Sequence, residues 1–217
     1  ALFALLAILA PINLSAATAV DQLGRKVLVP DRPVRIVCLA PSITEIMFAL
    51  DLSDRLVGAT QFSDYPPRAN SLPKVGSYIR LDVEKIVALQ PDLCIAVKDG
   101  NPITAIRKLE ALDIPVYAVD PRNLEAVMDT LQELGRLLHV SDRSTAIVAG
   151  MRQRIEQVRQ AVSGAEHRPT VFFQIGIAPI VSVGTNTFIH ELIVMAGGVN
   201  LAAGDTPYPR FSKEAVI

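Results

Sequence analysis

The sequence has 217 residues, of which half are hydrophobic and one fifth are charged, and its formal net charge is -1 at pH 7. A chain of this length and composition can bury one or two hydrophobic cores. Because the charges are balanced and no run of Lys and Arg occurs, the composition argues against nucleic acid as a partner, since phosphate binding requires clustered basic side chains.

The N-terminal segment is typical of an export signal. Residues 1–19, ALFALLAILAPINLSAATA, form an uncharged apolar run followed by small residues, which is the pattern of a secretory signal and its cleavage site. We expect cleavage after Ala17 or Ala19. The starting Met and the basic region of a signal are missing, so residues 1–19 are interpreted as a signal peptide remnant. The alternative is a buried core helix, which Pro11 would interrupt.

Buried strands and amphipathic helices then alternate along the sequence, after a short hairpin. The expected strands are 34–39, 55–59, 93–97 and 115–119. The expected helices are 42–50, 83–89, 102–111 and 124–139. Strands separated by helices need crossover connections, which imply a parallel sheet with both faces covered. This part of the sequence therefore predicts an α/β lobe.

Several helix starts carry capping residues. Ser42 and Glu45 have the spacing of a capping box, in which the serine caps the helix. Asn101 precedes Pro102 at an expected first helical position, and Asn123 precedes another helix. We expect Ser42, Asn101 and Asn123 to cap the three helices that follow them.

Two cysteines, Cys38 and Cys94, lie in short aliphatic runs that predict buried strands. In an exported protein they can form a disulfide. We favour the alternative that both are free thiols in the core. Neither has a His or Cys at a spacing that suggests a metal site.

A long helix and a second lobe follow. From Ser141, apolar residues recur at helical spacing and predict one amphipathic helix of about 22 residues. These residues are Ile147, Met151, Ile155, Val158 and Val162. A strand at 170–175, a second strand in PIVSVG and a helix in TFIHELIVM begin another α/β unit. The predicted domains are an N-terminal lobe at 20–139, an interlobe helix at 140–165 and a partial C-terminal lobe at 166–217.

Aromatic residues concentrate in the connecting segments. Phe62, Tyr65, Tyr78, Tyr208 and Phe211 all lie in segments that contain Pro or Gly. Ligands of open parallel sheets bind beyond the carboxyl ends of the strands, so aromatic rings there suggest a flat apolar ligand. The alternative is that the rings cover the ends of the sheet as part of the core. We favour ligand contact for Phe62, Tyr78 and Tyr208, and a core role for Tyr65.

The sequence contains no recognisable catalytic set. It has no glycine-rich nucleotide motif and no Gly-x-Ser-x-Gly elbow. The three histidines, His139, His167 and His190, are far apart, and HEL at 190–192 lacks the second His of a zinc helix. We therefore expect no catalytic residues and no metal site.

One sequence pattern occurs twice. LDVEKIV at 81–87 and FSKEAVI at 211–217 both have a capping residue, a Glu two positions later and an aliphatic pair. Both patterns predict the first turn of a helix. The second helix begins at the end of the sequence.

Several blocks together resemble a known family. They are RIVCLAPSITEIMFAL, GATQFSDYPP, LPKVGSY, LDVEKIVALQPDLCIA, FFQIG and PYPRFSKEAVI. In this order they are similar to the cobalamin-binding periplasmic proteins of ABC importers, which belong to a wider group that also binds ferric siderophores and haem. The resemblance runs from about residue 34 to the last residue. It implies two parallel-sheet α/β lobes joined by one long interlobe helix, with the ligand in a cleft. Complete members continue beyond the SKEAV block, so we expect a second lobe that is incomplete and a sequence that is truncated at its C-terminus.

The resemblance also assigns roles to individual residues. It implies that Glu84 and Glu214 dock to arginines of a dimeric ABC permease, and that Phe62, Tyr78 and Tyr208 contact the ligand. Ser42 is implied to lie near the floor of the cleft. Phe62 stands where the best-matching members have Tyr, and Val97 stands where some have a large aromatic residue. These two departures bear on the identity of the ligand.

The sequence therefore predicts a monomeric, periplasmic solute-binding protein that captures cobalamin or a cobinamide-like corrinoid and delivers it to an ABC permease. Cobalamin would be the transported ligand, and no cofactor is expected. The alternative in the same class is a ferric siderophore or haem binding protein. In a different class, the alternatives are an exported metal-complex sensor and a corrinoid-handling enzyme.

Overall fold

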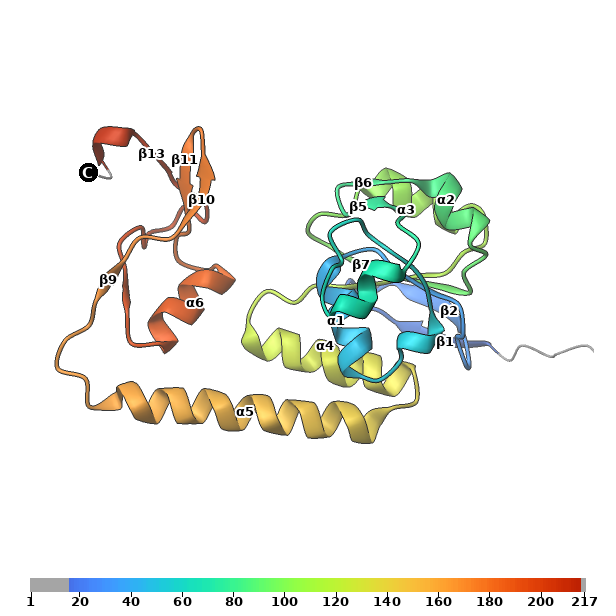
Figure 1. The fold of residues 1–217 in the computed structure, drawn as a ribbon, viewed down its shortest axis with the longest axis horizontal. Helices are drawn as coiled ribbons and strands as arrows, with labels where there is room; N and C mark the ends of the chain where they lie inside the picture. The colour runs from blue at the N-terminus through green and yellow to red at the C-terminus, as the bar shows by residue number, and fades with distance from the viewer. Residues whose placement is uncertain (1–15, 216–217) are drawn as a thin grey trace, which may run out of the picture. The chain divides into compact units, whose positions relative to one another are not determined.

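The structure, a computed structural model, describes residues 16–215, and Figure 1 labels their helices and strands. These residues divide into two compact units. Of the described residues, the first unit takes in 16–44, Ser53–Ala96 and Gly100–Ala118. The second unit takes in Glu45–Leu52, Val97–Asp99 and 119–215. Most of the predicted export signal lies outside the described residues.

The first unit begins with the expected hairpin. Strands β1 (Ala16–Val20) and β2 (Lys26–Pro30) are antiparallel. Between them, the buried carboxylate of Asp21 accepts hydrogen bonds from the backbone N–H groups of Leu23 and Arg25, at 3.0 and 2.9 Å. It also forms an ion pair with the Arg25 guanidinium at 2.7 Å. The predicted cleavage sites after Ala17 and Ala19 fall within β1 and stay predictions.

A four-stranded sheet forms the centre of this unit, in the order β4-β3-β7-β8. The strands are β3 (Ile36–Cys38), β4 (Leu56–Ala59), β7 (Leu93–Val97) and β8 (Val116–Val119). β3 is parallel to both β4 and β7. One face of the sheet packs against helices α2 (Val83–Ala88) and α3 (Ile103–Glu110), with Val37, Leu39 and Cys94 buried among Ile86 and Leu109. The α/β prediction is confirmed.

The register of the sheet explains why the two cysteines are free. Cys94 lies beside Val37, whereas Cys38 lies beside Ile95. Side chains alternate between the faces of a sheet, so the one-residue offset directs the two thiols to opposite faces. Both cysteines are buried and neither forms a disulfide. The preference for free core thiols is confirmed.

Two of the expected helix caps are wrong. Helix α1 (Pro41–Ala49) begins at Pro41, so Ser42 is its second residue and does not cap it. The ring of proline fixes the backbone in a helical conformation, and it is favoured at the first helical position. Helix α3 begins at Ile103. Pro102, the residue before it, occupies the cap position and makes no side-chain cap hydrogen bond. Asn101 instead bonds to two carbonyl groups described below.

Other caps agree with the sequence. Asn123 caps α4 (Leu124–Leu137), because its Oδ1 accepts a hydrogen bond from the backbone N–H of Ala126 at 2.7 Å. Asp82 caps α2 in the same way, through Lys85 at 3.1 Å. These bonds satisfy backbone donors that have no partner within the helix.

The second unit contains the predicted long helix as α5 (Ser141–Ser163), which has 23 residues. It lies against α4 at close range, because Gly135 leaves no space for a Cβ beside Ser144. Among the residues of α5, Ser144 and Val148 are fully buried. The apolar residues whose spacing predicted this helix are less buried than these two, and one of them, Val158, is 41 % exposed.

The predicted strand at 170–175 is divided into two strands. β9 (Thr170–Val171) pairs in parallel with β12 (Val199–Asn200), whereas β10 (Gln174–Ile177) pairs antiparallel with β11 (Ile180–Ser182). Helix α6 (Phe188–Met195) lies between β11 and β12 in the sequence, and β13 (Arg210–Phe211) pairs with β11. The second unit thus combines parallel and antiparallel sheets.

Short elements complete the fold. They are the strands β5 (Gly76–Ser77) and β6 (Arg80–Leu81) and the 3-10 turns η1 (Ser53–Arg55), η2 (Pro67–Ser71) and η3 (Lys213–Ala215).

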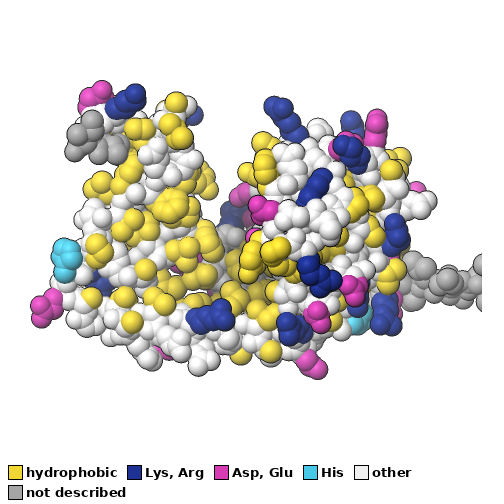
Figure 2. Space-filling view, viewed as in Figure 1, with side chains coloured by type: hydrophobic (Ala, Val, Ile, Leu, Met, Phe, Trp, Pro, Cys, Tyr) yellow, Lys and Arg dark blue, Asp and Glu magenta, His cyan; other side chains and the backbone are white. Residues whose placement is uncertain are grey.

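Large apolar side chains are exposed on the second unit, and they include Ile175, Ile177, Leu201 and Tyr208 (Figure 2). Among residues 16–215, no helix has both the length and the apolar character needed to cross a bilayer.

Candidate functional site

Three connecting segments of the first unit meet at the carboxyl ends of its parallel strands. The backbone N–H of Gln61, after β4, donates to the carbonyl of Gly76 at 2.8 Å. The side-chain amide of Asn101, after β7, donates to the carbonyls of Leu39 and Tyr78, both at 2.8 Å. The segments that follow β3, β4 and β7 are thus tied to one another at the edge where ligands of such sheets bind.

Tyr78 packs against a glycine at this edge. Gly100 has a φ of +122°, which side chains other than hydrogen rarely allow. A Cβ at residue 100 would lie 2.6 and 2.7 Å from Cδ2 and Cε2 of Tyr78. The ring of Tyr78, which is 38 % exposed, therefore depends on glycine at residue 100 for its position.

A buried cluster of hydroxyl groups anchors the backbone next to Phe62. Thr44 Oγ1 donates to Ser63 Oγ at 3.0 Å, and Thr60 Oγ1 lies 3.0 Å from the same oxygen. Thr44, Thr60 and Ser63 are almost fully buried, so these bonds are shielded from water. The adjacent ring of Phe62 is 57 % exposed. The structure therefore presents an apolar ring to solvent on a fixed backbone.

Lys74 also anchors this segment. Its ammonium group donates to the carbonyls of Ser63 and Ala69, at 2.7 and 2.9 Å. Burial lowers the pKa of Lys74, and the charge of Asp64 opposes this shift. The charge-assisted bonds hold the turn between Phe62 and η2 in one conformation.

One further residue of this loop region differs in its exposure from the expectation. Tyr65 is 65 % exposed, so the core role expected for it is wrong. It precedes two prolines, and its ring extends from the loop into solvent. Ser42, which the resemblance places near a cleft floor, is exposed on the first turn of α1.

Tyr208 belongs to the second unit. It is 59 % exposed and lies in the segment between β12 and β13. The backbone N–H of Gly184 anchors this segment by donating to the carbonyl of Pro207 at 2.8 Å. Phe211, in contrast, is half-buried in β13, and its ring meets Phe172 edge-to-face at 5.4 Å between centroids. Phe211 therefore stabilises the fold, whereas Tyr208 is accessible to a ligand.

The two predicted docking glutamates are both exposed. Glu84 is the second residue of α2 and follows the cap Asp82, whose pKa is lowered mainly by the hydrogen bond from the Lys85 N–H. Glu214 lies in η3. The pKa of Glu214 is lowered by hydrogen bonds from its own N–H and from the Ser212 hydroxyl, which keeps the carboxylate charged. The helix expected from residue 212 is a 3-10 turn over the described residues.

The histidines lie on three separate segments. His139 follows the end of α4 and has a φ of +61°, His167 lies between α5 and β9, and His190 lies in α6. Within the described part of the sequence, no three His, Cys, Asp or Glu side chains are close enough together to hold a metal ion.

Gly100 and Asn101 were missed as residues that position Tyr78. A glycine and an asparagine directly after a buried strand are a sequence signal for a special turn. The sequence does not show which ring or which carbonyls the turn supports, because these belong to segments more than 20 residues away.

A family profile described as periplasmic binding protein matches residues 36–217. The vitamin B12-binding protein of Vibrio campbellii is 34 % identical over 184 residues, which cover 84 % of this protein and 66 % of that relative. The sequence thus spans about two thirds of the relative's length.

Solved structures of similar proteins share the fold. The periplasmic vitamin B12 binding protein BtuF of Vibrio cholerae is 33 % identical, with a TM-score of 0.73 over 86 % of this protein and 73 % of that one. A periplasmic heme binding protein from Pseudomonas aeruginosa is 30 % identical, with a TM-score of 0.79 over 85 % of this protein and 68 % of that one.

These findings define an α/β binding protein, and the chain belongs to the periplasmic binding protein family. The resemblance inferred from the sequence blocks is confirmed. The similar proteins are named for the ligands they bind, and none of those described above is named as an enzyme.

Proposed function

We propose that this protein is an exported, periplasmic solute-binding protein that captures cobalamin or a related corrinoid and delivers it to an ABC permease. Phe62, Tyr78 and Tyr208 would contact the faces and edges of the ligand, and Ser42 would lie beside them. Cobalamin would be cargo, and the protein would catalyse no reaction.

The observation that carries this proposal is the exposure of three aromatic rings on anchored loops. Phe62, Tyr78 and Tyr208 expose 57 %, 38 % and 59 % of their surfaces. Aromatic side chains are enriched at binding surfaces, because they bury much area at a low entropic cost. The names of the relatives from the two Vibrio species support a corrinoid as the flat ligand.

Haem is the second candidate, because a structure of a heme binding protein aligns with a TM-score of 0.79. Haem and corrins share a flat macrocycle around a metal ion, so the same rings can stack on either. Tyr78 and Tyr208 carry phenolic oxygens that can serve as a ligand of haem iron. A ferric siderophore is the third candidate, from the same family.

Calorimetric titration of the purified protein with cyanocobalamin, haem and a ferric hydroxamate tests the proposal. We expect saturable binding of cyanocobalamin, with an affinity that falls by about tenfold in Phe62→Ala, as for a central aromatic contact. Tyr65→Ala is the matched control, because Tyr65 is an exposed ring of the same loop that is assigned no contact. Binding of haem but not of cyanocobalamin would transfer the assignment to the second candidate.

Delivery to a permease is the second part of the proposal. Glu84 and Glu214 each expose a carboxylate two residues after a residue with a capping side chain. Carboxylates form bidentate ion pairs with arginine, so two similar exposed turns suit two similar permease subunits.

A further inference from the structure

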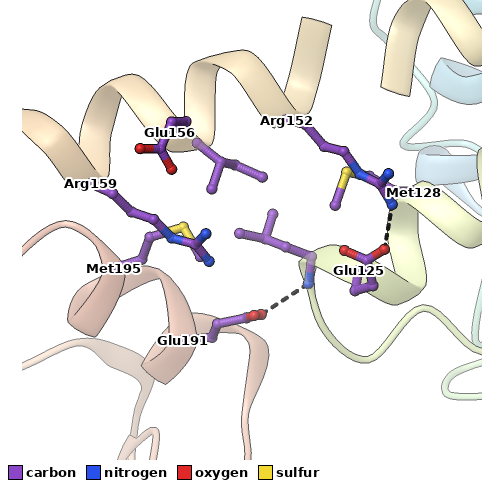
Figure 3. A pocket seen from close by; sticks show the side chains of 9 residues that line it. Glu125, Met128, Arg152, Glu156, Arg159, Glu191 and Met195 are labelled. Carbon is purple, nitrogen blue, oxygen red and sulfur yellow. Dashed lines mark hydrogen bonds and ion pairs between the residues drawn. The ribbon is translucent and has the colours of Figure 1, made fainter. Parts of the chain in front are cut away.

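The second unit contains a pocket that no part of the proposed function uses. It has a volume of about 820 Å³ and lies where the start of α4, helix α5 and the start of α6 meet. Most of the residues that line it have polar side chains, and they include Arg122, Asn123, Arg159, Asn186, His190 and Glu191. A neighbouring pocket of about 430 Å³ shares Arg159, Glu191 and Met195 with it (Figure 3).

A buried amide determines which nitrogen of His190 carries the proton. Asn200, which is 4 % exposed, accepts the backbone N–H of Ala202 with Oδ1 at 3.1 Å. Its Nδ2 donates to the carbonyl of Val183 at 2.7 Å and lies 3.1 Å from Nδ1 of His190. Because Nδ2 has only hydrogens to offer, Nδ1 accepts, and the proton of the neutral ring is on Nε2. His190 therefore offers the pocket an N–H donor.

Asn123 also presents an N–H donor, because its side-chain oxygen is used to cap α4. Its Oδ1 accepts the N–H of Ala126 at 2.7 Å. The NH₂ group is the part of this amide that no backbone bond fixes, so Asn123 also offers a donor.

Two guanidinium groups add positive charge. Arg159 forms no ion pair or hydrogen bond with any residue in the described part of the protein. Figure 3 shows Arg159 extending from α5 towards α6. Arg122, which also lines the pocket, pairs with Asp120 through Nε at 2.8 Å, and its terminal nitrogens are further donors.

The single carboxylate that lines the pocket is already engaged. Glu191 Oε2 accepts the backbone N–H of Leu124 at 2.9 Å (Figure 3). In the neighbouring pocket, Glu125 is paired with Arg152 at 2.6 Å, and Glu156 lies on α5. The larger pocket is thus lined by four donor groups, two of them charged, and by one carboxylate, while Asp120 offsets part of the charge of Arg122.

We propose that this pocket binds a phosphate group. Phosphate accepts several charge-assisted hydrogen bonds at once, and arginine has the geometry to supply them in pairs. The phosphate has two conceivable sources, which are the phosphodiester in the nucleotide tail of cobalamin and free inorganic phosphate. The first source rests on the proposed function, whereas the second does not.

Three probes and three proteins test this assignment. The probes are inorganic phosphate, cyanocobalamin, and dicyanocobinamide, a corrinoid that lacks the phosphodiester and its nucleotide. The proteins are the wild type, Arg159→Gln and the control Arg154→Gln, which removes a guanidinium from the same helix but from outside this pocket. Calorimetry at one fixed concentration of sodium chloride keeps charge screening constant.

We expect Arg159→Gln to weaken the binding of inorganic phosphate by about tenfold, the usual effect of losing one charge-assisted hydrogen bond. We expect Arg154→Gln to leave it unchanged. A loss of affinity for cyanocobalamin but not for dicyanocobinamide identifies the nucleotide tail as the source. A loss confined to inorganic phosphate identifies the free anion and also supports the pocket.

Two outcomes separate this inference from the proposed function. A wild-type protein that binds phosphate through Arg159 but binds neither corrinoid overturns the proposed function and leaves the pocket assigned. A wild-type protein that binds no phosphate, with equal corrinoid affinities in all three proteins, overturns the inference alone. Nitrogen NMR of His190 gives a second readout, because its Nε2–H resonance should shift on addition of inorganic phosphate and stay unchanged on addition of chloride.

Discussion

The ring of Tyr78 occupies the space that a side chain on Gly100 would need, since a Cβ at residue 100 would lie 2.6 Å from Cδ2 of the ring. In the sequence, β6, α2 and β7 separate these two residues. The amide of Asn101 holds the backbone of Tyr78 at the same point. The position of one proposed ligand contact therefore depends on residues that would not touch the ligand.

We expect Gly100→Ala to lower both the free energy of unfolding and the affinity for the ligand. The methyl group would collide with Tyr78, and the φ of +122° would be strained, at a combined cost of about 2 kcal/mol. Urea denaturation and calorimetry measure the two effects. Gly24→Ala is the matched control, because Gly24 has a φ of +75° but has no atom near an added Cβ. Equal effects in the two variants would show that Tyr78 does not depend on Gly100.

We expect the double variant Glu84→Ala, Glu214→Ala to bind the ligand as tightly as the wild type and to support no transport. Both carboxylates are exposed, so their loss would remove the proposed contact with arginines of the permease and leave the binding loops intact. Uptake of labelled cyanocobalamin into cells and calorimetry on the purified protein give the two readouts. Glu166→Ala serves as the control for loss of an exposed carboxylate. Lost ligand affinity in the double variant would show that the glutamates belong to the ligand site and not to a permease-docking surface.

We expect Asp120 to titrate below the ordinary pKa of aspartate, which is about 3.9. The hydrogen bond from Arg122 is the main cause, and Lys98 adds to it while partial burial opposes it. A lowered pKa in the folded state stabilises the protein above the pKa of the unfolded state, and this contribution is lost as the pH falls through the folded pKa. Carbon NMR of the Asp120 carboxyl measures the midpoint. In Arg122→Gln the midpoint should rise, and an unchanged midpoint would refute the assigned cause.

We expect both cysteines to be inert towards thiol reagents in the folded protein at pH 8. Burial raises the pKa of Cys38 to about 12, against the opposing hydrogen bond from Thr44, and burial also raises the pKa of Cys94. The reactive thiolate is therefore almost absent, and both sulfur atoms are shielded from solvent. Counting modified thiols before and after unfolding in urea measures this. Rapid modification of Cys38 in the folded protein would contradict its burial.

The sequence predicted the regular elements well, because their signals are local. The alternation of buried strands with amphipathic helices indicated the α/β class, and Asn123 marked the start of α4 correctly. Ser42 failed as a cap because Pro41, one position earlier, is a better first helical residue. Asn101 failed because Pro102 takes the cap position of α3, and the Nδ2 of Asn101 donates to two carbonyls from distant segments. Local patterns do not report such distant partners.

The candidate site was only partly predictable. The sequence shows which aromatic residues lie in segments that contain Pro or Gly, and Phe62, Tyr78 and Tyr208 were chosen on that basis. Tyr65 has the same signal and was interpreted wrongly, since sequence does not show on which side of a loop a ring lies. Arg159 looks like any solvated charge on the polar face of a long helix, and its place in a donor-lined pocket depends on α4 and α6.

The close approach of α4 and α5 at Gly135 and Ser144 restricts how the second unit can rearrange. Packing without an intervening side chain interlocks the two helices, and the ion pair between Glu125 and Arg152 joins them again further along. Sliding of one helix along the other would break both contacts, so shear is disfavoured as a mode of movement here. Under the proposed function, α4 and α5 should move together as one rigid body when a ligand binds or leaves, and the bending should fall on the segments that lead into and out of them.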